Sequence, residues 1–235
     1  MNKIGFSHVK ELTEFIQESG VAVFECNIVE KKRELIRLGV KLNGILHGQL
    51  EAGYYISKTN QPQADLSSFP MYSIFINREI DNDAKYSFLL HEYGHHLCDI
   101  RHCGCMVPDT FHPVAEAHAH AFVIGRLKEK SFPLALLKYV KAVMKLILQY
   151  SNTNYWDAKL ASELFCQVLK KERPLEAISK EDLNEIEKAI EDIKSLMEFH
   201  SILDEKSSNE ICAFALSLLP VGSDTRYIKL VEDMF

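Results

Sequence analysis

The residues whose types and spacing could do chemistry are His91, Glu92 and His95, which form the pattern HExxH. Residues four apart on a helix lie on one face, so both imidazoles can point at a single metal ion. This spacing favours zinc, and a glutamate directly after the first histidine can reach a water molecule bound to the metal. Because a chain with ten histidines can contain the pattern by chance, neighbouring residues have to support it.

A third ligand is predicted downstream, in the helix-like run PVAEAHAHAF. In this run, Glu116 lies 21 residues after His95. A carboxylate there can complete a zinc site with two histidines and leave the fourth tetrahedral position open, as catalytic sites do. By the helical period His120 lies beside Glu116, whereas His118 is rotated by about half a turn. We therefore expect Glu116 as the third ligand and His120 as a neighbour of the site.

Two supporting roles are predicted near these ligands. Asp99, one turn after His95, can accept the proton on the other nitrogen of that ring, although a solvated residue at a helix end fits equally well. An oxyanion formed at the site needs a hydrogen-bond donor besides the metal. His120 is the first candidate, followed by Tyr93 and Tyr86, and both tyrosines are also typical of a hydrophobic core.

Four further potential ligands cluster after the HExxH pattern, namely Cys98, His102, Cys103 and Cys105. Thiolates and imidazole can hold a structural zinc ion, so a second metal site is one interpretation. The spacing lacks the paired C-x-x-C of zinc ribbons, which favours reduced thiols in a loop.

The motif residues carry a resemblance to a known family. The segments YSFLLHEYGHHLCD and EAHAHAF resemble the ImmA/IrrE family of zinc metallopeptidases, in which an HExxH helix is followed by E-x-x-A-[ND]-x-F-A on the next helix. Glu116, Ala119 and Phe122 match this second motif, and His120 stands at the Asn or Asp position. The resemblance covers residues 1–130.

The resemblance implies a zinc-dependent hydrolase that cleaves a protein or peptide partner at few sites, often a repressor-like regulator. In such a reaction Glu92 would act as general base and then as general acid. Substrates of zincins generally pair with an exposed sheet edge, and Ser73–Asn77 is the segment predicted to provide it, although an ordinary half-buried strand fits these residues equally well. A zinc-bound regulatory or binding module without turnover is the alternative, and a helical interaction protein with an accidental HExxH is a third. The intact Glu92 favours the enzyme.

Hydrophobic spacing predicts the elements that must position these groups. Apolar or β-branched runs predict strands at residues 21–24, 52–57 and 71–77. Helices are predicted before Gly20, over 30–46, around the HExxH pattern from 81–83, from 113 and from Ser131–Pro133. Apolar seams at residues 137–147 and 183–197 are typical of helices packed on their own domain, with a dimerising coiled coil as the alternative.

We therefore expect an α+β fold. A zincin-like domain over residues 1–130 would pack a small sheet on the HExxH helix, and an α-helical region would occupy 131–235.

Composition limits the remaining function classes. The 235 residues include 27 basic and 33 acidic side chains, a formal net charge of −6. No basic cluster dominates, so direct nucleic-acid binding is not expected. No apolar stretch approaches a signal peptide or a membrane span of about 18 residues, which predicts a cytoplasmic protein with reduced cysteines. The sequence does not specify an oligomeric state.

Overall fold

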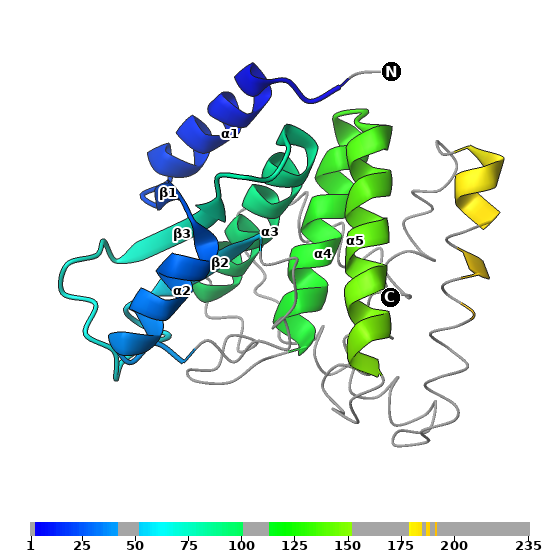
Figure 1. Cartoon of the computed structure of the whole chain (residues 1–235). Helices are drawn as coiled ribbons and strands as arrows, with labels where there is room; N and C mark the ends of the chain where they lie inside the picture. Colours follow the sequence, from blue (N-terminus) through cyan, green and yellow to red (C-terminus); the bar gives the residue numbers. More distant parts are fainter. Residues whose placement is uncertain are drawn as a thin grey trace.

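The computed structural model of this chain describes residues 3–41, 52–100, 113–151, 179–184, 187–188 and 191. Its described part is a mixed α+β structure with one small sheet (Figure 1). The helices are α1 (Phe6–Glu18), α2 (Ile28–Arg37), α3 (Asn82–Ile100), α4 (Pro113–Glu129) and α5 (Pro133–Ser151). The strands are β1 (Ala22–Cys26), β2 (Gly53–Ser57) and β3 (Tyr72–Asn77). The strands and the helices predicted up to residue 151 are therefore confirmed within a few residues, with one exception: the helix predicted over 30–46 ends at Arg37, so its predicted extension over residues 38–41 is wrong, and residues 42–46 lie outside the described residues.

Local sequence explains where the helices begin and end. Gly20 follows α1 with φ +89°, a conformation that favours glycine, as predicted. The Asn27 side chain accepts hydrogen bonds from the first turn of α2, which starts earlier than predicted. That helix ends at Arg37, and Gly39 follows with φ +86°. The Asp81 carboxylate accepts from the Ala84 backbone at 2.9 Å and so caps α3.

The three strands pair in the order β1-β3-β2, with β1 parallel and β2 antiparallel to β3. The prediction that Ser73–Asn77 offers an edge for a substrate is therefore wrong, because β3 is paired on both sides. Its continuous apolar run explains the central position, since Ile74, Phe75 and Ile76 are all buried. Within the described residues, β2 is paired only with β3, so its other side is an edge.

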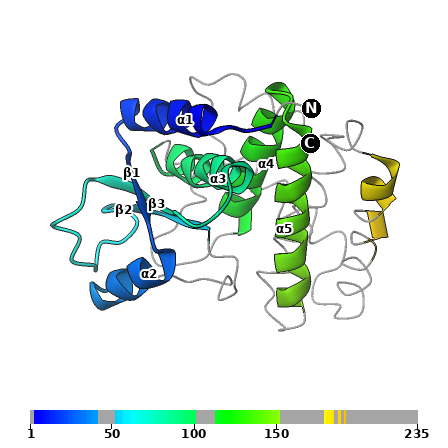
Figure 2. The same cartoon turned by 45° about the horizontal axis from the view of Figure 1, so that its top comes forward.

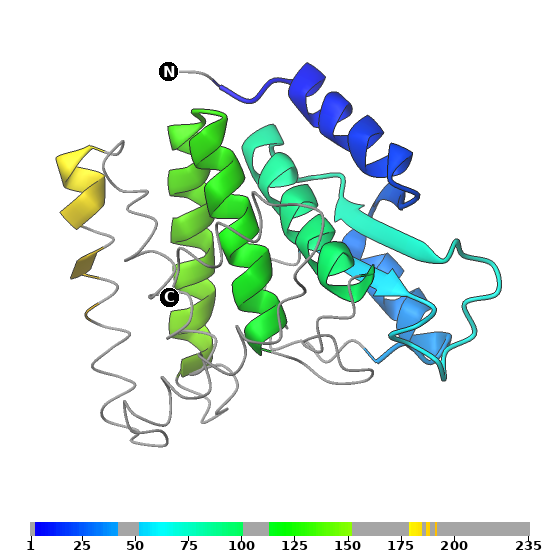
Figure 3. The same cartoon turned by 180° about the vertical axis from the view of Figure 1, so that it is seen from behind.

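Helices cover both faces of this sheet. Ile74 and Ile76 of β3 pack into a cluster with α1, α3, α4 and α5, while Phe75 between them faces a second cluster with α2. The alternation follows from the two-residue period of a strand. Figure 2 shows α1 and α3 on one side of the sheet and α2 on the other. Helix α3, which carries the HExxH pattern, thus lies between the sheet and helices α4 and α5 (Figure 3).

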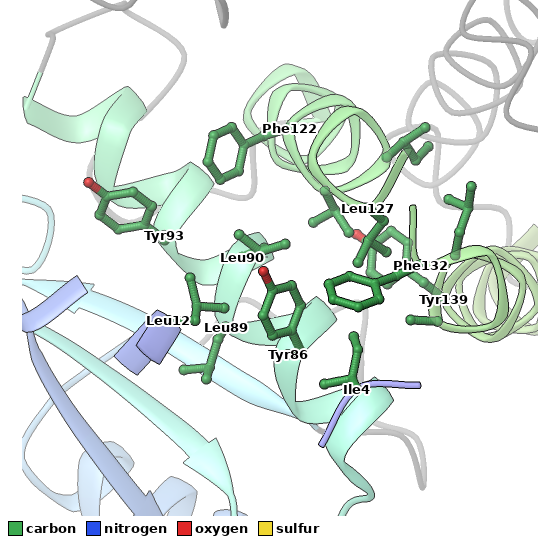
Figure 4. Packing of buried hydrophobic residues seen from close by; sticks show 14 of the residues in the cluster. Ile4, Leu12, Tyr86, Leu89, Leu90, Tyr93, Phe122, Leu127, Phe132 and Tyr139 are labelled. Atoms are coloured by element: carbon green, nitrogen blue, oxygen red, sulfur yellow. The ribbon is translucent and has the colours of Figure 1, made fainter. Parts of the chain in front are cut away.

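Helix α5 belongs to the same hydrophobic cluster as the HExxH helix. Figure 4 shows Phe132 and Tyr139 close to Tyr86 and Leu127, where α3, α4 and α5 converge. The predicted division at residue 130 falls in the short turn between α4 and α5, which share this core. The division itself stays a prediction, and the seam predicted over 183–197 lies mostly outside the described residues.

None of the helices in the described ranges is long and apolar enough to cross a membrane.

Candidate metal centre

A contact between two small residues brings α3 and α4 together at the HExxH pattern. A Cβ atom at Gly94 would lie 3.0 Å from Ala119 Cα and 3.3 Å from Ala119 Cβ. Gly94 lies between the two histidines of the pattern, and Ala119 lies one turn after Glu116. The absence of a side chain at position 94 therefore lets α4 deliver its carboxylate to the two imidazoles.

The three predicted ligands meet at this contact. Glu116 Oε2 lies 3.2 Å from His91 Nε2, and Glu116 Oε1 lies 3.3 Å from His95 Nε2. The two Nε2 atoms are 3.2 Å apart. A tetrahedral zinc ion with bonds of about 2.0–2.1 Å separates its ligand atoms by about 3.3 Å. The described residues His91, His95 and Glu116 therefore form a group that could hold a metal ion.

The electrostatics of this group match a metal site. Burial raises the pKa of Glu116, but the charges and hydrogen bonds of His95 and His91 hold it well below its ordinary value. Burial lowers the pKa of His95, yet Glu116 and Glu92 outweigh it and the pKa is raised. The carboxylate is thus ionised beside two imidazoles, an arrangement that a cation stabilises.

Glu92 lies beside the ligands and against strand β2. Its Cγ would be 3.2 Å from a Cβ atom at Gly53, and it accepts a hydrogen bond from the Tyr55 backbone. Burial raises the pKa of its carboxyl group, while the neighbouring charges of His91 and His95 act in the opposite direction. A carboxyl group with a raised pKa can accept a proton and return it near neutral pH.

His120 lies next to the ligands, as predicted, and a tyrosine joins it to them. The Tyr139 hydroxyl lies 2.7 Å from His120 Nδ1 and 2.9 Å from His91 Nδ1. Burial, followed by the charge of His91, lowers the pKa of His120 to about 3, so this ring is neutral. Burial also raises the pKa of Tyr139 well above its ordinary value, so the hydroxyl keeps its hydrogen.

Tyr139 was missed by the sequence reasoning. The only signal was a tyrosine within the apolar seam of residues 137–147, because a hydroxyl group in a core needs a partner. The seam did not indicate which partner, since His91 and His120 lie on other helices.

The structure places other candidates away from the metal group. Asp99 accepts a hydrogen bond from the Tyr55 hydroxyl at 2.7 Å, so the prediction that it supports His95 is wrong. Among the described residues, His95 Nδ1 has no hydrogen-bond partner. Tyr93 and Tyr86 lie in the hydrophobic cluster, as the core interpretation expected, and their rings pack against Phe122 and Phe132 respectively.

The cysteine cluster is described only at Cys98. Its Sγ lies 3.5 Å from His118 Nδ1, and both residues are buried between α3 and α4. His102, Cys103 and Cys105 lie outside the described residues, so the second metal site stays a prediction.

Comparison of the chain with protein-family models, with curated proteins and with solved structures finds no match in any of the three. The interpretation of function therefore depends on the chemistry of the site itself.

Proposed function

We propose that this chain is a zinc metallopeptidase that cleaves a protein or peptide partner at few sites. The observation that carries the proposal is the triangle of His91, His95 and Glu116, with ligand atoms 3.2–3.3 Å apart and Glu92 beside it. Two imidazoles and one carboxylate are a common ligand set of catalytic zinc, which keeps a coordination position for water. A purely structural site has no need of Glu92.

When bound, zinc would lower the pKa of a coordinated water to about 7 and polarise the carbonyl group of a peptide bond. Glu92 would accept the proton of the attacking water and deliver it to the leaving amine. Its burial and raised pKa suit both directions of transfer. His120, neutral and next to His91, is the proposed donor to the oxyanion.

The position of strand β2 favours a peptide as the substrate. Its side away from β3 is an edge within the described residues, and its Gly53 and Tyr55 contact Glu92. An extended peptide can add to such an edge through backbone hydrogen bonds and so place a peptide bond near Glu92. We propose β2 for this role in place of the central strand β3. A repressor-like regulator is the proposed partner class, on the motif resemblance alone.

Metal analysis and peptidase assays of matched variants test the proposal. Wild type and Glu92→Gln should contain about one zinc ion per chain, and His95→Ala should contain none, because it loses one of three ligands. Cleavage of peptide libraries or unfolded protein should be lost in both variants. Glu129→Gln, the same change at an exposed position of α4, should behave like wild type.

Two outcomes would contradict the proposal. Protein purified without chelators that contains no zinc and takes none up would refute the metal centre. Zinc binding with no cleavage that depends on Glu92 would instead favour the regulatory or binding module.

A further inference from the structure

Three buried side chains form a continuous set of hydrogen bonds behind the metal centre. The Tyr139 hydroxyl lies between His91 Nδ1 at 2.9 Å and His120 Nδ1 at 2.7 Å. Phe88 packs against the rings of Tyr139 and His91, with centroid distances of 5.7 Å and 6.4 Å, and so restricts both. A hydroxyl group has one hydrogen, so Tyr139 can donate to one nitrogen and must accept from the other.

Without a metal ion, Glu116 determines the direction of these bonds. Its ionised carboxylate only accepts hydrogen bonds, and it lies 3.2 Å from His91 Nε2. His95 Nε2, which lies 3.2 Å from His91 Nε2, donates to the other carboxylate oxygen, Glu116 Oε1, at 3.3 Å. A neutral His91 therefore carries its proton on Nε2, and its Nδ1 accepts from the Tyr139 hydroxyl. The Tyr139 oxygen then accepts from His120 Nδ1, and Nε2 of His120 carries no proton.

With a metal ion held at Nε2 of His91, this direction would be reversed. The coordinating nitrogen must be free of its proton, so a neutral His91 carries the proton on Nδ1 and donates it to Tyr139. Tyr139 then donates its hydrogen to His120 Nδ1, which must be unprotonated to accept it. The proton of His120 consequently lies on Nε2.

We infer that Tyr139 is a positioning residue that couples metal binding at His91 to the tautomer of His120, so that His120 becomes an Nε2–H donor when the metal is held. The proton count balances. One proton leaves His91 Nε2 for solvent, one hydrogen moves along each of the two hydrogen bonds, and one proton from solvent binds His120 Nε2. The inference rests on the metal binding of the proposed function. Its consequence is that the proposed oxyanion donor forms only in the loaded site.

Histidine tautomers can be read directly from two-bond proton–nitrogen correlation spectra of the full chain with isotope-labelled histidine. Spectra are recorded with and without zinc at about pH 8, where an ordinary histidine with a pKa of about 6.5 is neutral. In wild type we expect His120 to be protonated at Nδ1 without zinc and at Nε2 with zinc. An unchanged His120 tautomer would overturn the inference, whatever the variants do.

Tyr139→Phe removes the hydroxyl and keeps the ring. We expect the His120 tautomer to become independent of zinc and the zinc affinity to fall about tenfold, as for other groups that orient a metal ligand. Tyr86→Phe is the matched control, because Tyr86 lies in the same hydrophobic cluster and its ring packs on Phe132. Wild-type affinity and a zinc-dependent His120 tautomer in Tyr139→Phe would overturn the coupling.

The readouts separate this inference from the peptidase proposal. Neither the spectra nor zinc competition depends on turnover. A protein that binds zinc and switches the His120 tautomer without cleaving any peptide would refute the peptidase and support the coupling.

Discussion

Replacing Gly94 with alanine tests whether the approach of α3 and α4 sets the affinity of the metal centre. The new Cβ would lie 3.0 Å from Ala119 Cα and 3.3 Å from its Cβ. Carbon atoms in ordinary contact lie about 3.5–4.0 Å apart, so the helices would have to separate by about 0.5 Å. Glu116 lies on α4 one turn before Ala119, so its carboxylate would be withdrawn from His91 and His95.

Two effects of opposite sign act on the folding free energy of Gly94→Ala. Alanine is the better helix former by about 1 kcal/mol. An extra methyl group in a close-packed contact costs about 1–3 kcal/mol. The metal-free variant should therefore be destabilised by up to about 2 kcal/mol. Zinc affinity should fall in addition by about tenfold, or about 1.4 kcal/mol, because Glu116 must reach its partners from a displaced helix.

Denaturant unfolding of the chelator-treated protein measures the change in folding free energy. Competition with a chromogenic chelator measures the change in zinc affinity. The double variant Gly94→Ala/Ala119→Gly lacks the 3.3 Å contact and should recover part of the lost affinity, although it adds a helical glycine. A Gly94→Ala protein that is about 1 kcal/mol more stable than wild type and binds zinc equally well would refute the reasoning. Helix propensity alone would then explain the change.

Three further predictions concern groups around the site. Gly53→Ala places a Cβ 2.9 Å from the Phe75 carbonyl oxygen and 3.2 Å from Glu92 Cγ. Because Glu92 would be displaced, kcat should fall about tenfold or more while the zinc content is retained. An unchanged kcat would show that this contact does not constrain the position of Glu92. In the metal-free protein the pKa of His95 is higher in the folded state than its unfolded value of 6.5. The stability that this difference contributes is fully present below pH 6.5 and is lost as pH rises through the folded-state pKa. The difference in unfolding free energy between metal-free wild type and His95→Gln should therefore shrink with rising pH, and a constant difference would contradict it. Burial lowers the pKa of His96 to about 4, so the contribution of neutral His96 to the free energy of unfolding is present above pH 6.5 and is lost as pH falls from 6.5 to 4. In urea unfolding, the free energy of unfolding of His96→Gln should therefore depend less on pH in this window than that of wild type. An equal pH dependence of the two proteins would contradict the prediction.

Local patterns were sufficient for most of the elements and for the three residues that could hold a metal ion, whereas the helix predicted over 30–46 ends already at Arg37. The i, i+4 spacing of His91 and His95 fixes their common face on any helix, and the helical period places Glu116 and His120 together on the next one. Runs of β-branched and aromatic residues likewise located the three strands. Each of these inferences concerns residues within one element, where backbone geometry determines which side chains are neighbours.

Neighbours from different elements could not be predicted in the same way. The helical period allowed Asp99 to serve His95, but packing against β2 gives its carboxylate the Tyr55 hydroxyl as donor. Strand order also depends on tertiary structure, because an apolar run indicates burial on both faces without indicating which strands flank it.

The sequence by itself determined the types of the candidate ligands and the helices that carry them, because these depend on residue identity and helical period. Only the tertiary structure decided that α4 approaches α3 at Gly94 and Ala119, and that α5 brings the Tyr139 hydroxyl to His91 and His120. The physical reason is that such contacts arise from the packing of one shared hydrophobic cluster, in which the position of each helix depends on all the others.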